Sequence, residues 1–292
     1  KKWFEDNAPR AINCVITGYG TEGPRASEPG YDFVLQAETG LMSITGVGDV
    51  ATKHGVAIVD VLTGNHAAVA ILAALMERRS SGRGQSVSVS LLQSGLSLLA
   101  NVASNYLASG ASPGRYGNGH PNIVPYRVYE TATDMIVLAI GNDTQFKKFW
   151  ALAGRTEWES DSKLTTNAKR VRNRGYVDQL VENVMIMHPA DWWIESLKRE
   201  GVPCGFVNDV PGALRDEQVL ALGMVEDSIH RGIGPVRQIA SPLSFSRTPV
   251  KPRRHAPLLG QDTDEVLSEL GLGSDEIVAL RAAGAFGQVP NP

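Results

Sequence analysis

The chain has 292 residues, 42% of them hydrophobic and 20% charged, which is the composition of a globular protein with one large domain or two. The formal net charge of −3 argues against nucleic acid as a partner, so a polyanionic ligand would need local basic groups. The two cysteines, Cys14 and Cys204, indicate neither a disulfide framework nor a zinc cluster, and they favour an intracellular location, in the cytoplasm or the mitochondrial matrix.

Strand and helix patterns alternate in the first third of the chain. An apolar run at 11–17 predicts a buried strand, and residues 31–43 have the spacing of a helix. The run HGVAIVD at 54–60 predicts a second strand, and 63–79 predicts the strongest helix. We expect no membrane span, because the richest apolar run, at 67–76, is about half the length needed. The alternation indicates an α/β fold.

Turns become more frequent in the rest of the chain. SVSVSLL at 86–92 predicts a strand that continues into an apolar helix. The segment SGASPGRYGNGHPNIVP at 109–125 is the richest in turn residues, so we place a domain boundary there. The basic run KPRRH at 251–255 either holds an anion or lies on the surface. Later elements are predicted as a hairpin at 126–141, helices at 143–153, 172–184, 190–200, 216–223, 262–271 and 274–283, and β segments at 202–207 and 230–246.

A glycine-rich loop follows the first predicted strand. GYGTEG at 18–23 has the G-x-G-x-x-G spacing of dinucleotide-binding loops. That site needs a helix after the glycines and an acidic residue about 20 residues later. Pro24 and Pro29 would break such a helix, and Glu38 lies inside a predicted helix. We therefore interpret the loop as a turn at the end of a strand, and not as a nicotinamide or flavin site.

Four ordered blocks of sequence carry a resemblance to a known family. They are ITGYGTEGPRASEPGYDFVLQAETGLMSITG at 16–46, VAIVDVLTGNHAAVAILAALMERRSSGRGQSVSVSLL at 56–92, YGNGHPNIVPY at 116–126 and PLLGQDTDEVLSELG at 257–271. Together they resemble the class III CoA-transferase family, which includes formyl-CoA:oxalate, carnitine-related and succinyl-CoA:dicarboxylate transferases and the related α-methylacyl-CoA racemases. The resemblance extends over essentially the whole chain.

The resemblance implies an architecture. It implies an α/β chain with a Rossmann-like large domain that lacks its N-terminal segment, a smaller α+β domain, and an interlocked homodimer. We expect part of the large domain at 1–108, a glycine-rich linker loop at 109–125, the small domain at 126–225, and a C-terminal segment at 226–292 that returns to the large domain. It implies no metal and no permanently bound cofactor, because CoA enters as the acyl-CoA substrate, and it implies no nucleic acid or membrane partner.

Asp60 is the first candidate for chemistry. It ends a predicted strand and precedes a helix, a usual place for a functional residue in α/β proteins. The helix N-terminus also favours its ionised form. On the residues alone, a role as a helix-capping aspartate is equally well supported. The resemblance implies that Asp60 is the nucleophile, which attacks an acyl-CoA thioester and then carries CoA as an aspartyl thioester.

The loop YGNGH at 116–120 is the second candidate. Gly117 and Gly119 allow backbone N–H groups to approach a ligand closely. The resemblance implies that this loop covers the active site, shields an anhydride from water and helps to hold the oxyanion. His120 either contacts a substrate carboxylate or packs within the loop. A plain turn between domains is the alternative interpretation of the whole segment.

Three further residues are candidates for binding substrate and CoA. The resemblance places Tyr31 and Asp32 beside the CoA thioester, although Asp32 also suits a helix N-cap. The racemase branch has a histidine near the position of Tyr31, and a phenol, with an ordinary pKa near 10, exchanges an α-proton less readily. This difference favours a transferase. Arg83, with Arg78 and Arg79, either offers charge to a CoA phosphate or lies in a solvated turn.

These observations predict transfer of CoA from an acyl-CoA, succinyl-CoA being the favoured donor, to a carboxylic or dicarboxylic acid. The first alternative is an acyl-CoA racemase or epimerase of the same fold, which needs a base where Tyr31 stands. The second is a catalytically inactive fragment or a structural dimerisation partner.

Overall fold

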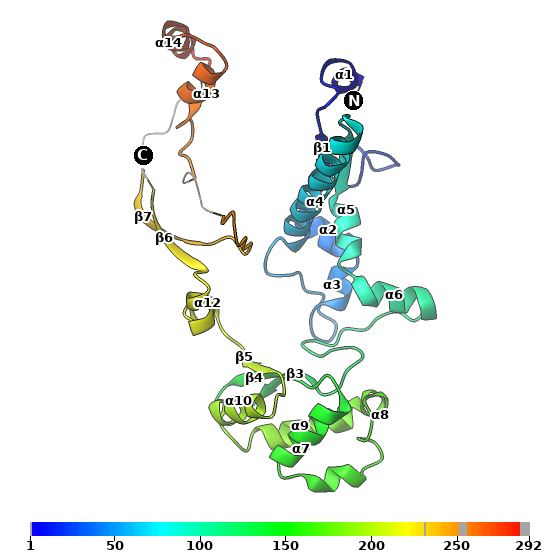
Figure 1. The fold of residues 1–292 in the computed structure, drawn as a ribbon. Coiled ribbons are helices and arrows are strands. Elements are labelled where there is room, and N and C mark those ends of the chain that lie inside the picture. Colours follow the sequence, from blue (N-terminus) through cyan, green and yellow to red (C-terminus); the bar gives the residue numbers. More distant parts are fainter. Residues whose placement is uncertain (1, 231, 251–255, 287–292) are drawn as a thin grey trace. The chain divides into compact units, whose positions relative to one another are not determined.

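Helices alternate with short strands along the chain, as the sequence predicts for a mixed α/β protein (Figure 1). A computed structural model describes residues 2–230, 232–250 and 256–286. It divides the chain into two units, Lys1–Val207 and Asn208–Pro292. The finer division predicted at 108, 125 and 225 stays a prediction, and the basic run at 251–255 lies outside the described residues.

A parallel pair of strands organises the N-terminal part of the first unit. β1 (Asn13–Thr17) lies parallel to β2 (Ser86–Ser90), with Asn13 beside Ser86 and Thr17 beside Ser90. Parallel strands need a long crossover. The long helix α4 (Ile58–Ser81) lies within that crossover and packs against both strands (Figure 1). The other helices of this part are α1 (Lys2–Asn7), α2 (Asp32–Glu38), α3 (Leu41–Ile44), α5 (Leu91–Ser97) and α6 (Ala100–Ser109).

The strand predicted at 54–60 is wrong. Residues 51–57 are irregular and Ile58 begins α4, so Asp60 lies in the first turn of a helix and not at the end of a strand. A short apolar run such as VAIV fits a buried strand and the start of a helix equally well by periodicity. The helix forms here because its first N–H groups find an acceptor on another helix, as described below.

β1 is less buried than its sequence predicts. Val15 is 36% exposed and Ile16 is 53% exposed. Among the described strands β1 pairs with β2 alone, whereas parallel sheets are normally covered on both faces. These side chains therefore belong to an apolar face that the described residues leave open.

α4 is long and apolar enough, by length and composition, to cross a membrane. An 18-residue window within its 24 residues has a mean hydropathy of 1.7, and 22% of that window is buried. A count of consecutive apolar residues in the sequence finds no run long enough to cross a membrane. Thr63, Asn65 and His66 interrupt the apolar run, but they do not prevent a high average hydropathy over the helix. The core helix of a soluble protein passes the same test, so length and composition alone are weak evidence for a membrane span.

An antiparallel sheet covered by helices makes up the rest of the first unit. The strand order is β3-β4-β5, and the hairpin and the helix predicted over 126–153 are both confirmed. Aromatic side chains such as Phe146, Phe149 and Trp193 form the centre of its core. The elements are β3 (Tyr126–Glu130), β4 (Met135–Ala139), α7 (Asp143–Leu152), the 3₁₀ helix η1 (Thr156–Ser160), α8 (Asn167–Arg172), α9 (Arg174–Met185), α10 (Ala190–Arg199) and β5 (Cys204–Phe206).

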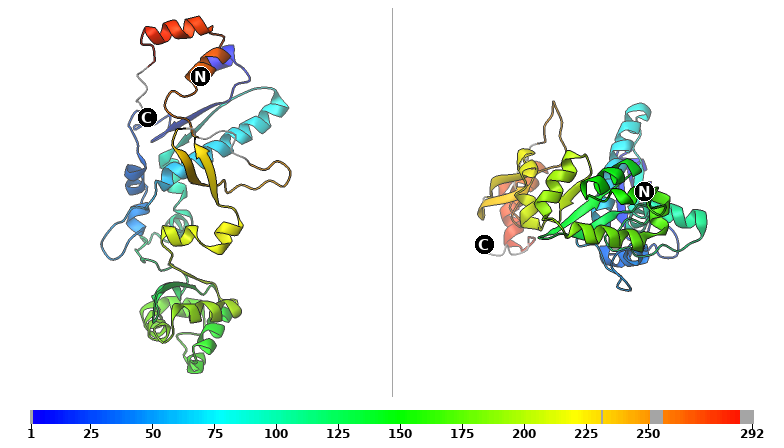
Figure 2. Two further views of the ribbon diagram at one scale, coloured as in Figure 1. Left: turned by 90° about the vertical axis from the view of Figure 1, so that its left-hand side faces the viewer. Right: turned by 90° about the horizontal axis from the view of Figure 1, so that it is seen from below.

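The second unit contains an antiparallel hairpin, coloured yellow in Figure 2. Its strands are β6 (Val225–His230) and β7 (Gly234–Ile239), so the predicted β segment begins earlier than expected. The N-cap of the last helix is Gly273, and no side chain caps that helix. The helices of this unit are α11 (Val210–Leu214), α12 (Glu217–Ala221), α13 (Thr263–Glu269) and α14 (Ser274–Ala282).

A fully buried arginine fixes the helices of the three-stranded part. Arg170 donates to Val124 O at 2.7 Å, to Leu164 O at 2.8 Å and to the Asp143 carboxylate at 2.8 Å. Burial lowers the pKa of the Arg170 guanidinium, and the Asp143 carboxylate opposes that shift. The side chain thus satisfies acceptors from three separate segments.

We predict that Arg170→Leu lowers the free energy of unfolding by about 3–5 kcal/mol, because it leaves two buried carbonyl oxygens unpaired and removes the cation beside the Asp143 carboxylate. Arg172→Leu is the matched control, since Arg172 is exposed on the same helix and should change stability by less than about 0.5 kcal/mol. Denaturant unfolding followed by tryptophan fluorescence measures both. Equal losses in the two variants would contradict the assignment.

Candidate active site

Two glycines bring the segment around Tyr31 to the end of β1. A Cβ atom on Gly18 would lie 2.8 Å from Gly30 Cα, and one on Gly30 would lie 2.6 Å from Gly18 Cα. The carbonyl of Gly18 also accepts a hydrogen bond from Leu92 N at 3.0 Å. Residues 18–31 form turns and no helix, in agreement with the interpretation of the G-x-G-x-x-G loop as a strand-end turn. Any side chain at either glycine would push these backbones apart.

Asp60 is the third residue of α4, and its side chain is exposed. The N-cap residue, Ala57, has no side-chain acceptor, so the first N–H groups of the helix need another partner. The carboxylate of Asp32 is that partner. Its Oδ1 accepts from Val59 N at 2.8 Å and from Asp60 N at 3.4 Å. The helix that carries Asp60 is therefore capped by a side chain 28 residues earlier in the sequence.

Gln36 holds Asp32 in place. Its side chain is 1% exposed, and its Nε2 donates to Asp32 Oδ2 at 2.6 Å and to Val56 O at 3.4 Å. Its Oε1 accepts from His54 N at 2.7 Å. The amide thus ties α2 to the irregular segment before α4, with both of its polar atoms satisfied. Sequence reasoning missed Gln36, for which the sole signal is the i,i+4 spacing from Asp32 on one helix.

The pKa of the Asp60 carboxyl lies above its ordinary value. Although the side chain is exposed, partial desolvation of the carboxyl by its neighbours is the larger cause, and the negative charge of Asp32 is the second. Asp32 therefore acts on Asp60 in two ways, since its oxygen fixes the backbone and its charge raises the affinity for a proton. An accessible carboxylate with a perturbed pKa at a helix N-terminus is typical of functional sites.

Arg115 anchors the start of the glycine-rich loop. Its Nε donates to Ser43 O at 3.0 Å and its Nη1 donates to Gly48 O at 2.6 Å. Gly117 has a left-handed backbone, with a φ of 57°, and a Cβ atom there would lie 3.3 Å from Val47 Cγ2. The loop therefore lies against the segment that follows α3, and a glycine is needed at this point of contact.

Arg174 anchors the end of the same loop. Its Nη2 donates to His120 O at 2.8 Å and to Pro121 O at 2.9 Å. Its guanidinium carbon lies 5.0 Å from the centroid of the Tyr116 ring. Since Arg174 begins α9, these contacts tie the loop to the helical part of the first unit.

Part of the loop's hydrogen-bonding capacity is used within the loop. Gly119 N donates to Tyr116 O at 2.8 Å, so this N–H is not available for the predicted oxyanion contact in this arrangement. The ring of His120 accepts at Nδ1 from Asn122 N at 3.0 Å and lies 5.2 Å from the Tyr126 ring, centroid to centroid. No acceptor among the described residues pairs with the Gly117 N–H, which leaves that donor for a ligand.

Within the described part of the chain, hydrogen bonds join Asp32 to the backbone at Asp60 and to none of the other predicted site residues. Tyr31 is the N-cap of α2, and its side chain is 76% exposed. Among the described residues, no hydrogen bond or ion pair links the loop at 116–120 to either aspartate. Arg115, just before the loop, is hydrogen-bonded instead to the segment at 43–48. A capping role therefore belongs to Asp32, whereas Asp60 is left with an uncommitted carboxylate.

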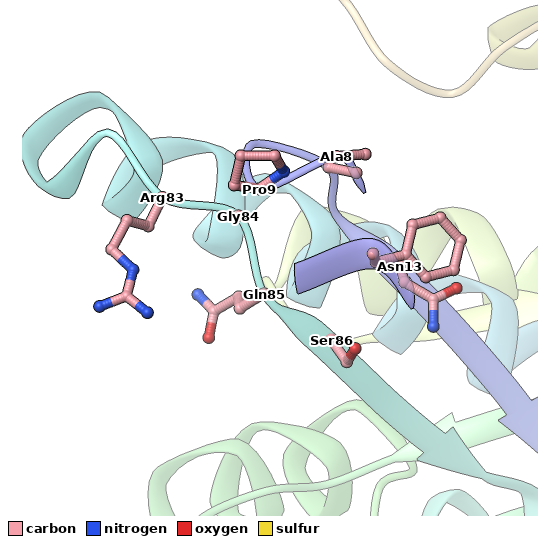
Figure 3. Close-up of a pocket in the computed structure, with 9 residues that line it drawn as sticks. Ala8, Pro9, Asn13, Arg83, Gly84, Gln85 and Ser86 are labelled. Carbon is pink, nitrogen blue, oxygen red and sulfur yellow. The ribbon is translucent and has the colours of Figure 1, made fainter. Parts of the chain in front are cut away.

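Asp60 lies at the N-terminal end of α4, and Arg83 follows the C-terminal end of the same helix. At 1.5 Å per residue, the helix from Asp60 to its last turn is about 30 Å long. Arg83 lines a cavity of about 300 Å³ with the first residues of both strands, Asn13 and Ser86. Figure 3 shows its guanidinium extending away from Asn13. The structure thus does not bring Arg83 to Asp60, and a contact with a CoA phosphate stays a prediction.

Comparison with known sequences identifies the family. The sequence profile of CoA-transferase family III matches residues 3–263. This chain belongs to CoA-transferase family III. It is 37% identical over 263 residues to the succinate–glutarate CoA-transferase of Agrobacterium fabrum, covering 90% of this chain and 66% of that protein. It is 33% identical over 288 residues to the succinyl-CoA:glutarate CoA-transferase of Homo sapiens, covering 98% of this chain and 66% of that protein.

The family assignment agrees with a solved structure. A CaiB/BaiF family protein from Brucella suis is 36% identical to this chain and superposes with a TM-score of 0.77, covering 92% of this chain and 70% of that one. This CoA-transferase family III chain spans about two thirds of the length of the curated relatives named above. The resemblance predicted from four sequence blocks is confirmed, and the roles of individual residues stay predictions.

We predict that Asp32→Ala lowers the free energy of unfolding by about 0.5–2 kcal/mol, because α4 loses its cap and Gln36 loses an acceptor. Asp49→Ala, in an exposed turn, is the control and should have an effect below about 0.5 kcal/mol. Denaturant unfolding measures both. An Asp32 variant as stable as the control would contradict the capping assignment.

A charge-swapped pair tests the contact between Asp32 and Gln36 itself. Asp32→Asn places an amide donor against the Gln36 donor, and Gln36→Glu places two carboxylates together, so each single variant should be less stable. The double variant restores one donor and one acceptor at the same place. We expect it to be more stable than the sum of the single effects by at least about 0.5 kcal/mol. Strict additivity would show that the two side chains are not coupled.

Proposed function

We propose that this chain transfers CoA from an acyl-CoA to a carboxylic acid through Asp60. The strongest support is an exposed aspartate of raised pKa, fixed in the first turn of α4 by Asp32, in a member of CoA-transferase family III. Two similar proteins are named for succinate or succinyl-CoA and for glutarate. We therefore propose succinyl-CoA as the donor and a dicarboxylic acid as the acceptor.

The first half of the proposed reaction loads CoA onto Asp60. A carboxylate oxygen of Asp60 attacks the thioester carbonyl carbon of the donor, the C–S bond breaks, and CoA thiolate leaves a mixed anhydride. The thiolate then attacks the Asp60 carbonyl carbon. The donor acid departs as its carboxylate, and an aspartyl-CoA thioester remains.

The second half unloads CoA onto the acceptor. A carboxylate of the acceptor attacks the aspartyl thioester, CoA thiolate leaves again, and a second mixed anhydride joins Asp60 to the acceptor. Attack of the thiolate on the acceptor's acyl carbon forms the new acyl-CoA and regenerates the Asp60 carboxylate. The overall reaction exchanges one thioester for another, so CoA serves as a substrate and the scheme needs no resident cofactor.

The glycine-rich loop has a proposed role in both halves. A mixed anhydride hydrolyses if water reaches it, so a covering segment preserves the intermediate. The N–H of Gly117, which has no acceptor among the described residues, is the group we propose for contact with a developing oxyanion. The two arginine anchors would keep the loop in a defined position during this contact.

We also propose the finer architecture that the resemblance implies, a Rossmann-like layer within an interlocked homodimer. The support is an apolar surface on α4, where Val69, Leu72 and Met76 are 64%, 60% and 70% exposed. Contiguous exposed apolar surface on a soluble protein indicates a covering partner. Val15 and Ile16 of β1 are also exposed, so we propose that the covering partner contacts the sheet as well.

We predict that Asp60→Asn lowers kcat by at least about 10⁴-fold, as loss of a covalent nucleophile does in other enzymes. The unfolding midpoint should stay unchanged or rise, because the amide replaces a carboxylate whose charged form is disfavoured beside Asp32. Transfer of CoA from succinyl-CoA to glutarate measures activity, with Asp49→Asn as the control. Full activity in the Asp60 variant would exclude the mechanism, and α-proton exchange on a 2-methylacyl-CoA without CoA transfer would favour the racemase branch.

The pH dependence of kcat/KM tests the electrostatic effect of Asp32 on Asp60. Because the charged form of Asp60 attacks, kcat/KM should fall as pH drops through the raised pKa of this carboxyl. Asp32→Asn removes the charge that contributes to the elevation, so the acid limb of the profile should move to lower pH. An acid limb that stays in place would show that Asp32 acts on Asp60 through structure alone.

A further inference from the structure

Arg25, in the turns between β1 and α2, binds the last residue of α2. Its Nη1 and Nη2 donate to the two carboxylate oxygens of Glu38 at 3.0 Å and 3.1 Å. Its Nε donates to Glu28, within the same turns, at 2.7 Å. Two parallel hydrogen bonds give the pair with Glu38 the geometry in which a guanidinium holds a carboxylate most firmly.

These contacts leave Arg25 without free positive charge for a ligand. One guanidinium faces two carboxylates, and its hydrogen bonds to Glu38 and then to Glu28 raise the pKa of Arg25. The bond to Arg25 is also the largest cause that lowers the pKa of Glu38. Glu38 follows Gly18 by about 20 residues, the place of the ribose-binding acid in a dinucleotide site. Here that acid is committed to Arg25, so the pair holds structure together and does not bind a nucleotide.

The guanidinium of Arg25 also covers the ring of Tyr19. Its central carbon lies 3.8 Å from the ring centroid, and Tyr19 is 8% exposed. Tyr19 belongs to the same hydrophobic cluster as Leu35 of α2 and Val59 of α4. Val59 directly precedes Asp60, and its N–H donates to Asp32. Arg25 therefore contacts the cluster that contains the start of α4.

The position of α2 depends on contacts at both of its ends. With 7 residues it is too short to be a stable helix on its own, so tertiary contacts decide where it lies. Its first residue, Asp32, caps α4, and its last residue, Glu38, is held by Arg25. A movement at the Glu38 end would therefore shift the Asp32 carboxylate relative to the N–H groups of Val59 and Asp60.

We propose that Arg25 is a positioning residue for Asp60, which acts by holding α2 through Glu38. This inference rests on the proposed function, in which Asp60 is the nucleophile. Within the described residues no hydrogen bond or ion pair joins Arg25 to Asp60, and its nitrogens bind carboxylates of the protein. Loss of the pair should therefore lower kcat and leave the KM for succinyl-CoA unchanged, because a small displacement of a reacting group slows the reaction strongly.

Kinetic variants separate this role from general stabilisation of the turns. We expect Arg25→Met and Glu38→Gln each to lower kcat by about 5- to 30-fold in CoA transfer from succinyl-CoA to glutarate, with KM changed less than about twofold. The double variant should be no slower than the slower single variant, because both changes remove one interaction. Glu28→Gln is the comparison within the cluster. Glu28 binds Arg25 but does not belong to α2, so the loss of kcat should be clearly smaller.

Hydrogen exchange tests the inference without turnover. Exchange of the Val59 and Asp60 amides, followed by NMR, reports their hydrogen bonds to Asp32. We expect exchange at least about 5-fold faster in Arg25→Met and Glu38→Gln. Glu22→Gln, at an exposed position of the same turns, is the control and should change neither exchange nor kcat. Arg25→Lys retains the charge and loses the fork, so we expect an intermediate effect with the unfolding midpoint preserved.

Unchanged amide exchange at Val59 and Asp60 in Arg25→Met, or additive losses of kcat in the double variant, would overturn the inference. Equal losses in Glu28→Gln and Glu38→Gln would also overturn it, because Arg25 would then act on the turns alone. If the unaltered chain does not transfer CoA through Asp60, the proposed function fails. The exchange measurement would still decide whether Arg25 fixes the start of α4, so the two can fail independently.

Discussion

The hydrogen bonds from the first turn of α4 to the Asp32 carboxylate determine the start of that helix and the position of Asp60. Ala57 offers no side-chain cap, so α4 depends on an acceptor from α2. The buried amide of Gln36 in turn fixes Asp32 and the segment at 54–56. Close contact between Gly18 and Gly30 brings α2 to the end of β1, where these groups can meet. A continuous series of backbone and side-chain contacts therefore connects the first strand to the candidate nucleophile.

Two arginines fix the position of the glycine-rich loop by binding backbone groups, as the Asp32 carboxylate fixes the start of α4. Arg115, at the start of the loop, donates to the carbonyls of Ser43 and Gly48. Arg174 donates to the carbonyls of residues 120 and 121 at the end of the loop. A guanidinium can hold carbonyl oxygens because all of its nitrogens carry donors, whereas an ionised carboxylate has acceptors alone.

Local patterns predicted those elements that depend on local sequence. The hairpin at 126–139 and the helices α7, α9 and α10 were predicted because turn residues and apolar spacing specify them directly. The strand predicted at 54–60 is wrong because the same residues begin a helix. The cap of that helix is the carboxylate of Asp32, which lies 28 residues before Asp60 in the sequence. Gln36 and Arg174 could not be identified, since most of their partners are backbone atoms of other segments that tertiary structure alone brings near. Family resemblance singled out Asp60, for which residue spacing allowed a capping role equally well.

Peptide mapping of the unaltered chain after incubation with succinyl-CoA is the most direct test of Asp60 as the nucleophile. We expect the peptide containing Asp60 to carry CoA as a thioester. Hydroxylamine should release this CoA and leave a hydroxamate on Asp60. CoA attached to a different peptide, or turnover without any modified Asp60 peptide under trapping conditions, would contradict the role of Asp60 as the nucleophile.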